Sequence, residues 1–162
     1  MNEIQIDTHN LINNTTHRND ITNNKLSPEL ELVVNKIRDI SQLVFDTLGT
    51  GFSEYIYHRA LEVELRQNNI EYESKKIIPI LYKNINIGYG EADLVIHLKD
   101  NKNLILELKA ISNSPREIEI AQVYTYLKSI PESVLGMVIN FPQPSTKKAK
   151  EMIDFELVYP KN

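Results

Sequence analysis

Three side chains in the middle of the chain have types and spacing that suit metal-assisted chemistry. Two strand-like runs, 92–98 and 103–109, are joined by a short polar turn, and a three-residue loop there would make Asp93 face Glu107 across an antiparallel pair. Directly opposed carboxylates repel each other, so a cation or a basic side chain must offset the repulsion. Strand alternation places Lys109 on the Glu107 side, and the sequence therefore predicts that the three side chains converge.

Paired carboxylates of this kind suit a hard divalent cation. Mg²⁺ takes oxygen ligands and commonly uses one or two carboxylates together with waters and substrate phosphates. The neighbouring ammonium would orient an attacking water and stabilise charge on phosphorus, so the chemistry indicated is hydrolysis of a phosphodiester. The alternative is a solvated hairpin face on which Lys109 neutralises a carboxylate, since surface ion pairs are common and contribute little. The spacing alone leaves both interpretations open.

The apolar patterning predicts the elements that must position these residues. Ser27 and Pro28 are typical of a helix start, and apolar residues then recur every three or four positions until Gly49 and Gly51. Short β-rich pieces separated by turn residues indicate a meander through the middle of the chain. The predicted helices span about 28–48, 52–67 and 115–129, and the predicted strands span 70–73, 76–82, 85–87, 92–98, 103–109, 134–140 and 155–159. This order predicts a mixed α/β fold.

Length and composition indicate one domain preceded by a loose tail. The chain has 162 residues, and residues 1–26 are rich in Asn and Thr without a sustained apolar period, so we expect a disordered or loosely docked tail before a domain over 27–162. The absence of cysteine excludes a disulfide framework and a thiolate metal site. The formal net charge of −4 argues against a protein that coats nucleic acid non-specifically.

The N-terminus and the apolar runs bear on localisation. No run reaches the roughly 20 apolar residues that cross a bilayer, and no basic segment is followed by an apolar one at the N-terminus. We therefore expect an intracellular protein, cytoplasmic or associated with a nucleoid or nucleus, that is neither secreted nor bound to a membrane.

The charged residues of the predicted strand pair, in order, resemble a known signature. Asp93, followed by Glu107-Leu108-Lys109 at the end of the next strand, is similar to the signature of the PD-(D/E)xK nuclease superfamily. The chain departs from that signature at Ala92, where the pattern has proline.

A second motif narrows the resemblance. Gly51, Glu54 and Tyr57 are spaced as in the GxxExxY motif, which names a small group within the superfamily. Blocks that resemble the other motifs of this group follow in the same order, at 60–61, 92–94, 107–110, 121–127 and 136–141. The resemblance covers about residues 30–142.

The resemblance implies a restriction-endonuclease-like fold, in which helices flank a mixed β-sheet. It implies that Asp93 and Glu107 bind Mg²⁺ or Mn²⁺, and that Glu54 on the preceding helix completes the metal site. Lys109 would then be the catalytic lysine, and Gln122 on the following helix would lie close to it. The implied partner is nucleic acid, DNA before RNA, and a homodimer is compatible with the family.

Several residues near these motifs have two interpretations. Glu91 adds a carboxylate just before Asp93, which would either enlarge the metal site or point away from it. Tyr57 is expected to pack in the interior with its hydroxyl on a polar partner. We expect His58 and His97 to lie outside the primary site, because His58 has no acidic neighbour at a recognisable ligand spacing and His97 lies further toward the turn.

The sequence also allows more than one interpretation of the basic residues and of the overall function. Six cations would form either a phosphate-contacting rim or a solvated surface: Lys75, Lys76, Arg116, Lys147, Lys148 and Lys150. Besides an active nuclease, the sequence allows a catalytically weak or inactive nucleic-acid-binding or assembly module that retains the fold. It also allows a structural protein whose acidic cluster is incidental.

Overall fold

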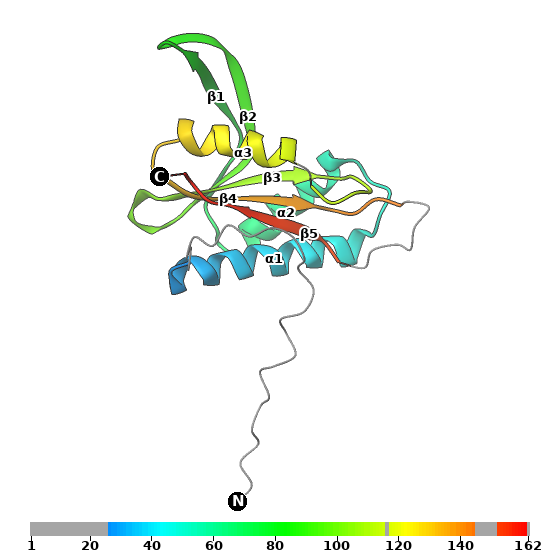
Figure 1. The fold of residues 1–162 in the computed structure, drawn as a ribbon. Coiled ribbons are helices and arrows are strands. Elements are labelled where there is room, and N and C mark those ends of the chain that lie inside the picture. The colour runs from blue at the N-terminus through cyan, green and yellow to red at the C-terminus, as the bar shows by residue number, and fades with distance from the viewer. Residues whose placement is uncertain (1–25, 116, 145–151, 162) are drawn as a thin grey trace, which may run out of the picture.

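The computed structural model describes residues 26–115, 117–144 and 152–161. These residues form one mixed sheet with helices on both faces (Figure 1). The elements are α1 (Pro28–Leu48), α2 (Glu54–Gln67), β1 (Tyr72–Tyr82), β2 (Ile85–His97), the 3-10 turn η2 (Lys99–Asn101), β3 (Asn103–Lys109), α3 (Glu117–Ser129), β4 (Ser133–Asn140) and β5 (Asp154–Val158).

Helix α1 begins and ends where the sequence predicts. The Ser27 hydroxyl accepts a hydrogen bond from the Leu30 backbone N–H at 3.3 Å, and Pro28 occupies the first turn, where its missing N–H costs nothing. Gly49 ends the helix with a φ of 71°, a conformation that favours glycine, and its N–H donates to the Phe45 carbonyl. The local sequence is therefore sufficient to set both ends of α1.

The sheet order is β1-β2-β3-β4-β5, and its strands are antiparallel except for the parallel pair β3 and β4. Helix α3 makes the crossover that a parallel pair requires. Helices α1 and α2 cover one face of the sheet and α3 covers the other, so each face buries its own apolar cluster (Figure 1). The predicted fold class, a restriction-endonuclease-like mixed sheet flanked by helices, is confirmed.

Two predicted breaks in the meander are wrong. The pieces predicted at 70–73 and 76–82 form the single strand β1, in which Lys75 has a φ of 53° at the predicted break. The pieces predicted at 85–87 and 92–98 form the single strand β2, because the intervening glycines stay extended. Gly90 is needed there for close packing, since a Cβ would lie 2.8 Å from Cε1 of Tyr126. As a result, β1 and β2 form one long hairpin that projects from the body (Figure 1).

Two predictions fall largely on residues outside the described part of the chain. The tail predicted over 1–26 lies there except for Leu26, which is partly buried against the cluster under α1 and α2. Arg116, Lys147, Lys148 and Lys150 also lie outside the described residues. Within the residues that are described, no helix combines the length and apolar character that a membrane span needs.

Gly136 in β4 provides a test of the packing between α3 and the sheet. A Cβ at this position would lie 2.2 Å from Cγ1 of Val123, so we expect Gly136→Ala to destabilise the fold by about 1–3 kcal/mol in urea denaturation. Gly88→Ala is the matched control, because a Cβ there meets nothing within 4 Å. Equal denaturation midpoints for the two variants would contradict the packing described here.

Candidate active site

The ladder between β2 and β3 stops at the predicted carboxylates. Leu94 pairs with Leu106 and Val95 with Ile105, which confirms the predicted register. Asp93 and Glu107 were expected to lie directly opposite each other, but they do not form a pair in the ladder, because the pairing of β2 with β3 ends at Leu94. Instead, Oδ2 of Asp93 accepts a hydrogen bond from the Leu108 backbone N–H at 2.7 Å. The Asp93 carboxylate therefore lies where the two strands separate and takes the place of a backbone partner.

Glu107 and Lys109 lie together near the end of β3. The Lys109 ammonium donates to Oε1 of Glu107 at 2.7 Å, and the Glu107 side chain is only 3% exposed. The other oxygen, Oε2, is buried and has no hydrogen-bond partner. A buried carboxylate oxygen without a partner is costly unless a ligand or ion completes its environment.

Glu54 reaches the same cluster from the first residue of α2. Its Oε2 lies 3.9 Å from the Lys109 ammonium, and its side chain is 40% exposed. The turn before α2 passes through Gly51, whose φ of 99° favours glycine and whose N–H donates to Oε1 of Gln143. Glu54 therefore lies at the solvent side of the buried carboxylates.

Tyr57 anchors that turn from the interior, as the sequence predicts. Its ring is fully buried and stacks on Phe141 with the centroids 4.5 Å apart. Its hydroxyl donates to the Gly49 carbonyl at 2.7 Å and accepts from Nε2 of Gln143. These contacts fix the chain between α1 and α2 and, with it, the position of Glu54.

Lys75 enters the site instead of lining its rim. Its ammonium contacts Oδ1 of Asp93 at 2.5 Å and Oε1 of Glu91 at 3.3 Å. The positive φ of Lys75 interrupts the pairing of β1 with β2 opposite Asp93. Glu91 is therefore paired through Lys75 next to Asp93, whereas Lys76 pairs with Glu73.

The expectation that His58 lies away from the site is wrong. Nδ1 of His58 is 3.9 Å from Oδ1 of Asp93, and Nε2 lies 2.9 Å from the Ser74 hydroxyl and 3.6 Å from Glu62. The signal that was missed is the four-residue spacing of Glu54, His58 and Glu62, which places them on one face of α2.

His97 and Gln122 contact groups other than the Asp93 and Glu107 carboxylates. His97 contacts Oδ1 of Asn103 at 3.1 Å, at the turn end of β2 as predicted. Gln122 donates to the hydroxyl of Tyr126 at 2.7 Å, and within the described residues no hydrogen bond joins it to Lys109 or to either carboxylate. The role expected for Gln122 therefore stays a prediction.

Asn140 is a buried positioning residue that the sequence analysis did not single out. Its Oδ1 accepts from the Ile111 N–H at 2.9 Å, and its Nδ2 donates to the carbonyls of Ile111 and Asn113. The adjacent Phe141 N–H donates to the Lys109 carbonyl at 2.8 Å. Together these bonds fix the chain that leaves β3 directly after Lys109; the available signal was one polar residue at the end of an apolar strand.

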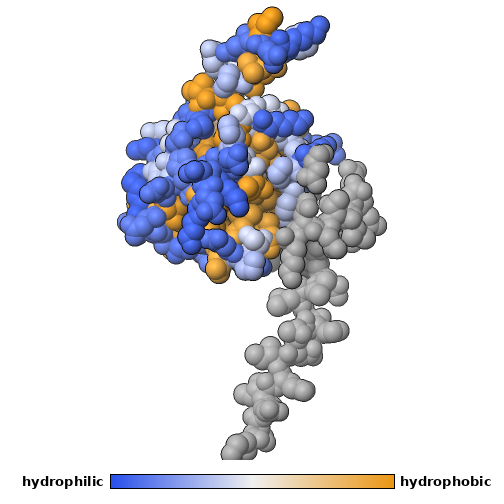
Figure 2. Space-filling model, turned by 90° about the vertical axis from the view of Figure 1, so that its left-hand side faces the viewer, coloured by the Kyte–Doolittle hydropathy of each residue, from blue (hydrophilic) through white to orange (hydrophobic). Residues whose placement is uncertain are grey.

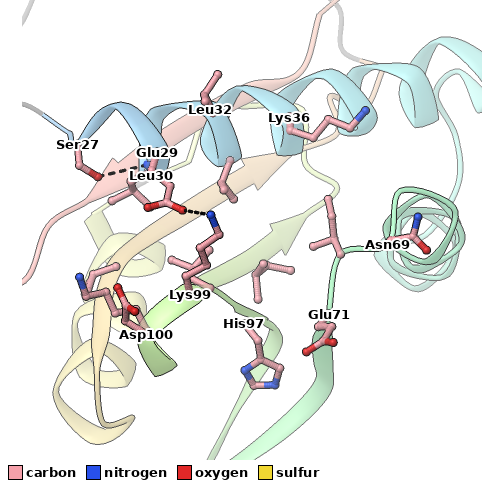
Figure 3. A pocket seen from close by; sticks show the side chains of 16 residues that line it. Ser27, Glu29, Leu30, Leu32, Lys36, Asn69, Glu71, His97, Lys99 and Asp100 are labelled. Atoms are coloured by element: carbon pink, nitrogen blue, oxygen red, sulfur yellow. Dashed lines mark hydrogen bonds and ion pairs between the residues drawn. The ribbon is translucent and has the colours of Figure 1, made fainter.

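A pocket elsewhere on the molecule does not belong to this cluster. It has a volume of about 670 Å³ and lies between the start of α1 and the turn after β2 (Figure 3). Its lining includes Leu30, Ile70 and His97, and the ion pair of Glu29 with Lys99 crosses it at 2.9 Å. None of the residues around Asp93 and Glu107 lines it.

The crowding of charges perturbs the ionisable groups of the site. Burial raises the pKa of Glu107 to about 7, the Asp93 charge adds to this effect, and Lys109 opposes it. Burial lowers the pKa of Lys109, but its hydrogen bond to Glu107 and the surrounding carboxylates outweigh burial, so its pKa is raised. Burial lowers the pKa of His58 against the opposing effect of Asp93. Lys109 is therefore a charged donor at neutral pH and His58 a neutral ring.

The Asp93 and Glu107 carboxylates fit a hard cation that keeps most of its water ligands. Among the described residues no cluster of three or more His, Asp or Glu side chains has metal-holding geometry. Two buried carboxylates are nevertheless the protein contribution that Mg²⁺ commonly uses. The unpartnered Oε2 of Glu107 supplies an oxygen for such a contact.

The raised pKa of Glu107 makes a prediction for the metal-free protein. In EDTA the unfolded chain loses this proton near pH 4.5 and the folded chain only near 7, so the favourable contribution present below pH 4.5 is lost as the pH rises to 7. We expect the unfolding free energy of the wild type to fall over this range relative to Glu107→Gln, by about 3 kcal/mol. Parallel curves for the two proteins in urea denaturation would contradict this electrostatic description.

Comparison with known proteins gives one family. A solved structure described as "Crystal structure of SSO0001" is similar over 80% of this chain and 68% of that chain, with 20% identity and a TM-score of 0.49. No curated protein matches the chain. The family model of the PD-(D/E)XK nuclease superfamily matches residues 31–153, which include all the carboxylates and lysines of the site. Because this match spans well over half of the sequence, the chain belongs to the PD-(D/E)XK nuclease superfamily.

Proposed function

We propose that this chain is a Mg²⁺-dependent nuclease that hydrolyses phosphodiester bonds in DNA, with Mn²⁺ as an alternative ion. The observation that supports this most is the burial of Asp93 and Glu107 where β2 and β3 separate, with Lys109 bonded to one Glu107 oxygen and nothing bonded to the other. Membership of the nuclease superfamily agrees with the same chemistry.

Asp93 and Glu107 would hold the ion, with Glu54 at the solvent side. A divalent cation bound there supplies charge neutralisation for the attacked phosphate and activation of the attacking water. Its positive charge would also keep Glu107 ionised at neutral pH, against the effect of burial. The Leu108 N–H holds Asp93 by Oδ2, so the orientation of this carboxylate is set by the backbone of β3.

Lys109 would act as a hydrogen-bond donor throughout the reaction. Its raised pKa keeps the ammonium charged, so it orients the attacking water and stabilises negative charge that develops on the phosphate oxygens. Glu107 and Glu54 hold the ammonium between them at 2.7 and 3.9 Å. The attacking water forms the new bond to phosphorus and gives up a proton to solvent, while the bond to the leaving sugar oxygen breaks and that oxygen takes up a proton.

One contact favours the alternative, a catalytically weak or inactive binding module. The Lys75 ammonium lies on Oδ1 of Asp93 and is also paired with Glu91, so it competes with a cation for that oxygen. For an active enzyme, Lys75 must move away or share Oδ1 of Asp93 with the ion, because a carboxylate oxygen has a second lone pair.

We also propose two finer assignments. The spacing of Gly51, Glu54 and Tyr57 supports membership of the GxxExxY group, since Gly51 forms the turn, Tyr57 anchors it and Glu54 reaches Lys109. All five strands belong to one sheet, which supports the assignment of residues 27–162 to one nuclease domain.

Cleavage assays test the proposed function. Purified protein is incubated with single- and double-stranded DNA and RNA in Mg²⁺, Mn²⁺ or EDTA. We expect metal-dependent cleavage of DNA that falls at least a thousandfold in Asp93→Ala and Lys109→Met, because each removes a group proposed to contact the ion or the reacting atoms. Lys128→Met, a change at a lysine of the last turn of α3, is the matched control and should keep full activity. Activity that survives in both site variants would contradict the assignment.

The metal and lysine roles can be separated by calorimetry. We expect Lys109→Met to retain Mn²⁺ affinity within about threefold of the wild type, because the ammonium is not a ligand, while Asp93→Ala loses binding. Loss of binding in Lys109→Met would show that the lysine is needed to build the metal site. Binding that requires Asp93 without cleavage of any substrate would favour the inactive module.

A further inference from the structure

The hairpin of β1 and β2 carries an unusual apolar surface beyond the body of the protein. Its outer part, residues 76–91, is called the arm here and projects past α3 (Figure 1). Hydrophobic residues show on the arm in the space-filling view as well (Figure 2). A two-stranded ribbon of this kind is marginally stable in water, so large exposed apolar side chains on it call for a binding partner.

The two faces of the arm differ. On one face Ile78 is buried against the cluster under α3, and Gly90 packs on Tyr126. The other face, called the apolar face, is built from alternate residues of both strands, and Pro79 pairs with Tyr89 at its centre. Its members are Ile77 (57% exposed), Pro79, Leu81 (59%), Ile87 (65%) and Tyr89 (71%).

We propose that the apolar face is the contact surface of a homodimer, in which the arms of two copies pack face to face about a two-fold axis. At these exposures the face presents on the order of 500 Å², so two copies would bury on the order of 1,000 Å² in total, the size at which specific interfaces begin.

The charges of the arm favour a second copy over nucleic acid. From residue 76 to residue 90 the only charged side chains are Lys76 and Lys83, and Lys76 is already paired with Glu73. Lys83, whose ammonium lies over the Tyr82 ring, is by itself too little to follow a phosphate backbone, because such binding depends on several Lys or Arg contacts.

The distribution of charge also suits an antiparallel arrangement. Lys83 lies in the turn at the tip, three residues after Ile80, and Glu91, which Lys75 also contacts at 3.3 Å, lies at the base, three residues after Gly88. A two-fold axis near the paired residues Ile80 and Gly88 therefore brings the tip lysine of one copy to the base carboxylate of the other. Such self-complementarity is what a two-fold interface requires.

The exposed edge of β1 also favours a dimer in which the arms pack face to face. Strand β1 is at the edge of the sheet, but Pro79 lies in its centre and has no N–H to donate. A proline in this place blocks continuous edge-to-edge pairing of strands. The arm can thus join a second copy through its side chains and not through an extended sheet.

Sedimentation of the full chain tests the proposal without reference to nuclease activity. We expect the wild type to have twice the 18.7 kDa monomer mass at 1–100 μM, and the double variant Ile87→Lys/Tyr89→Lys to be monomeric while it remains folded, as its cooperative unfolding transition would show. Ile118→Lys is the matched control, because Ile118 on α3 is 72% exposed and lies outside the arm, and it should stay dimeric.

Charge reversal tests the orientation of the two arms. Lys83→Glu should weaken the dimer at least tenfold, and Lys83→Glu/Glu91→Lys should restore it. A wild type that is monomeric at 100 μM overturns the proposal, as does dissociation of the Ile118→Lys control. A monomeric wild type whose DNA affinity falls in the Ile87→Lys/Tyr89→Lys variant would assign the face to nucleic acid instead. If the double variant Lys83→Glu/Glu91→Lys did not restore the dimer, the antiparallel arrangement would be overturned.

Discussion

The site depends on two like charges that are held together inside the protein. Asp93 and Glu107 are 4% and 3% exposed, and the charge of Asp93 adds to the effect of burial in raising the pKa of Glu107. The Leu108 N–H, the Lys75 ammonium and the Lys109 ammonium offset this repulsion from the protein side. The compensation is incomplete, as the raised pKa of Glu107 and its unpartnered oxygen show. A divalent cation would complete it, and this is the physical basis of the proposed function.

The rest of the fold positions these charges by backbone geometry. Strands β2 and β3 separate at Asp93, which opens the space its carboxylate occupies. Asn140 fixes the chain after Lys109, and Tyr57 fixes the turn that leads to Glu54. The charged groups are therefore carried by rigid elements, and burial in the two apolar clusters supplies the rigidity. Such preorganisation lets the charges act on a substrate without first rearranging.

Much of this arrangement could be predicted because local patterns dictate it. The ends of α1 follow from Ser27, Pro28 and Gly49, and the register of β2 with β3 follows from the length of their turn. The features that were predicted wrongly depend on contacts between segments that are distant in the sequence. Gly90 resembles a turn residue until Tyr126 is placed beside it, and His58 has no visible partner until β2 brings Asp93 to α2. Lys75 enters the site because its positive φ interrupts β1, and the sequence around Lys75 does not predict this conformation.

The most direct test of the central claim is anomalous scattering from a crystal grown with Mn²⁺. The account predicts one strong peak bound by both the Asp93 and the Glu107 carboxylates, with the Lys75 ammonium displaced from or sharing Asp93. A crystal with no Mn²⁺ peak at these two carboxylates, at concentrations that saturate hard-cation sites, would contradict it.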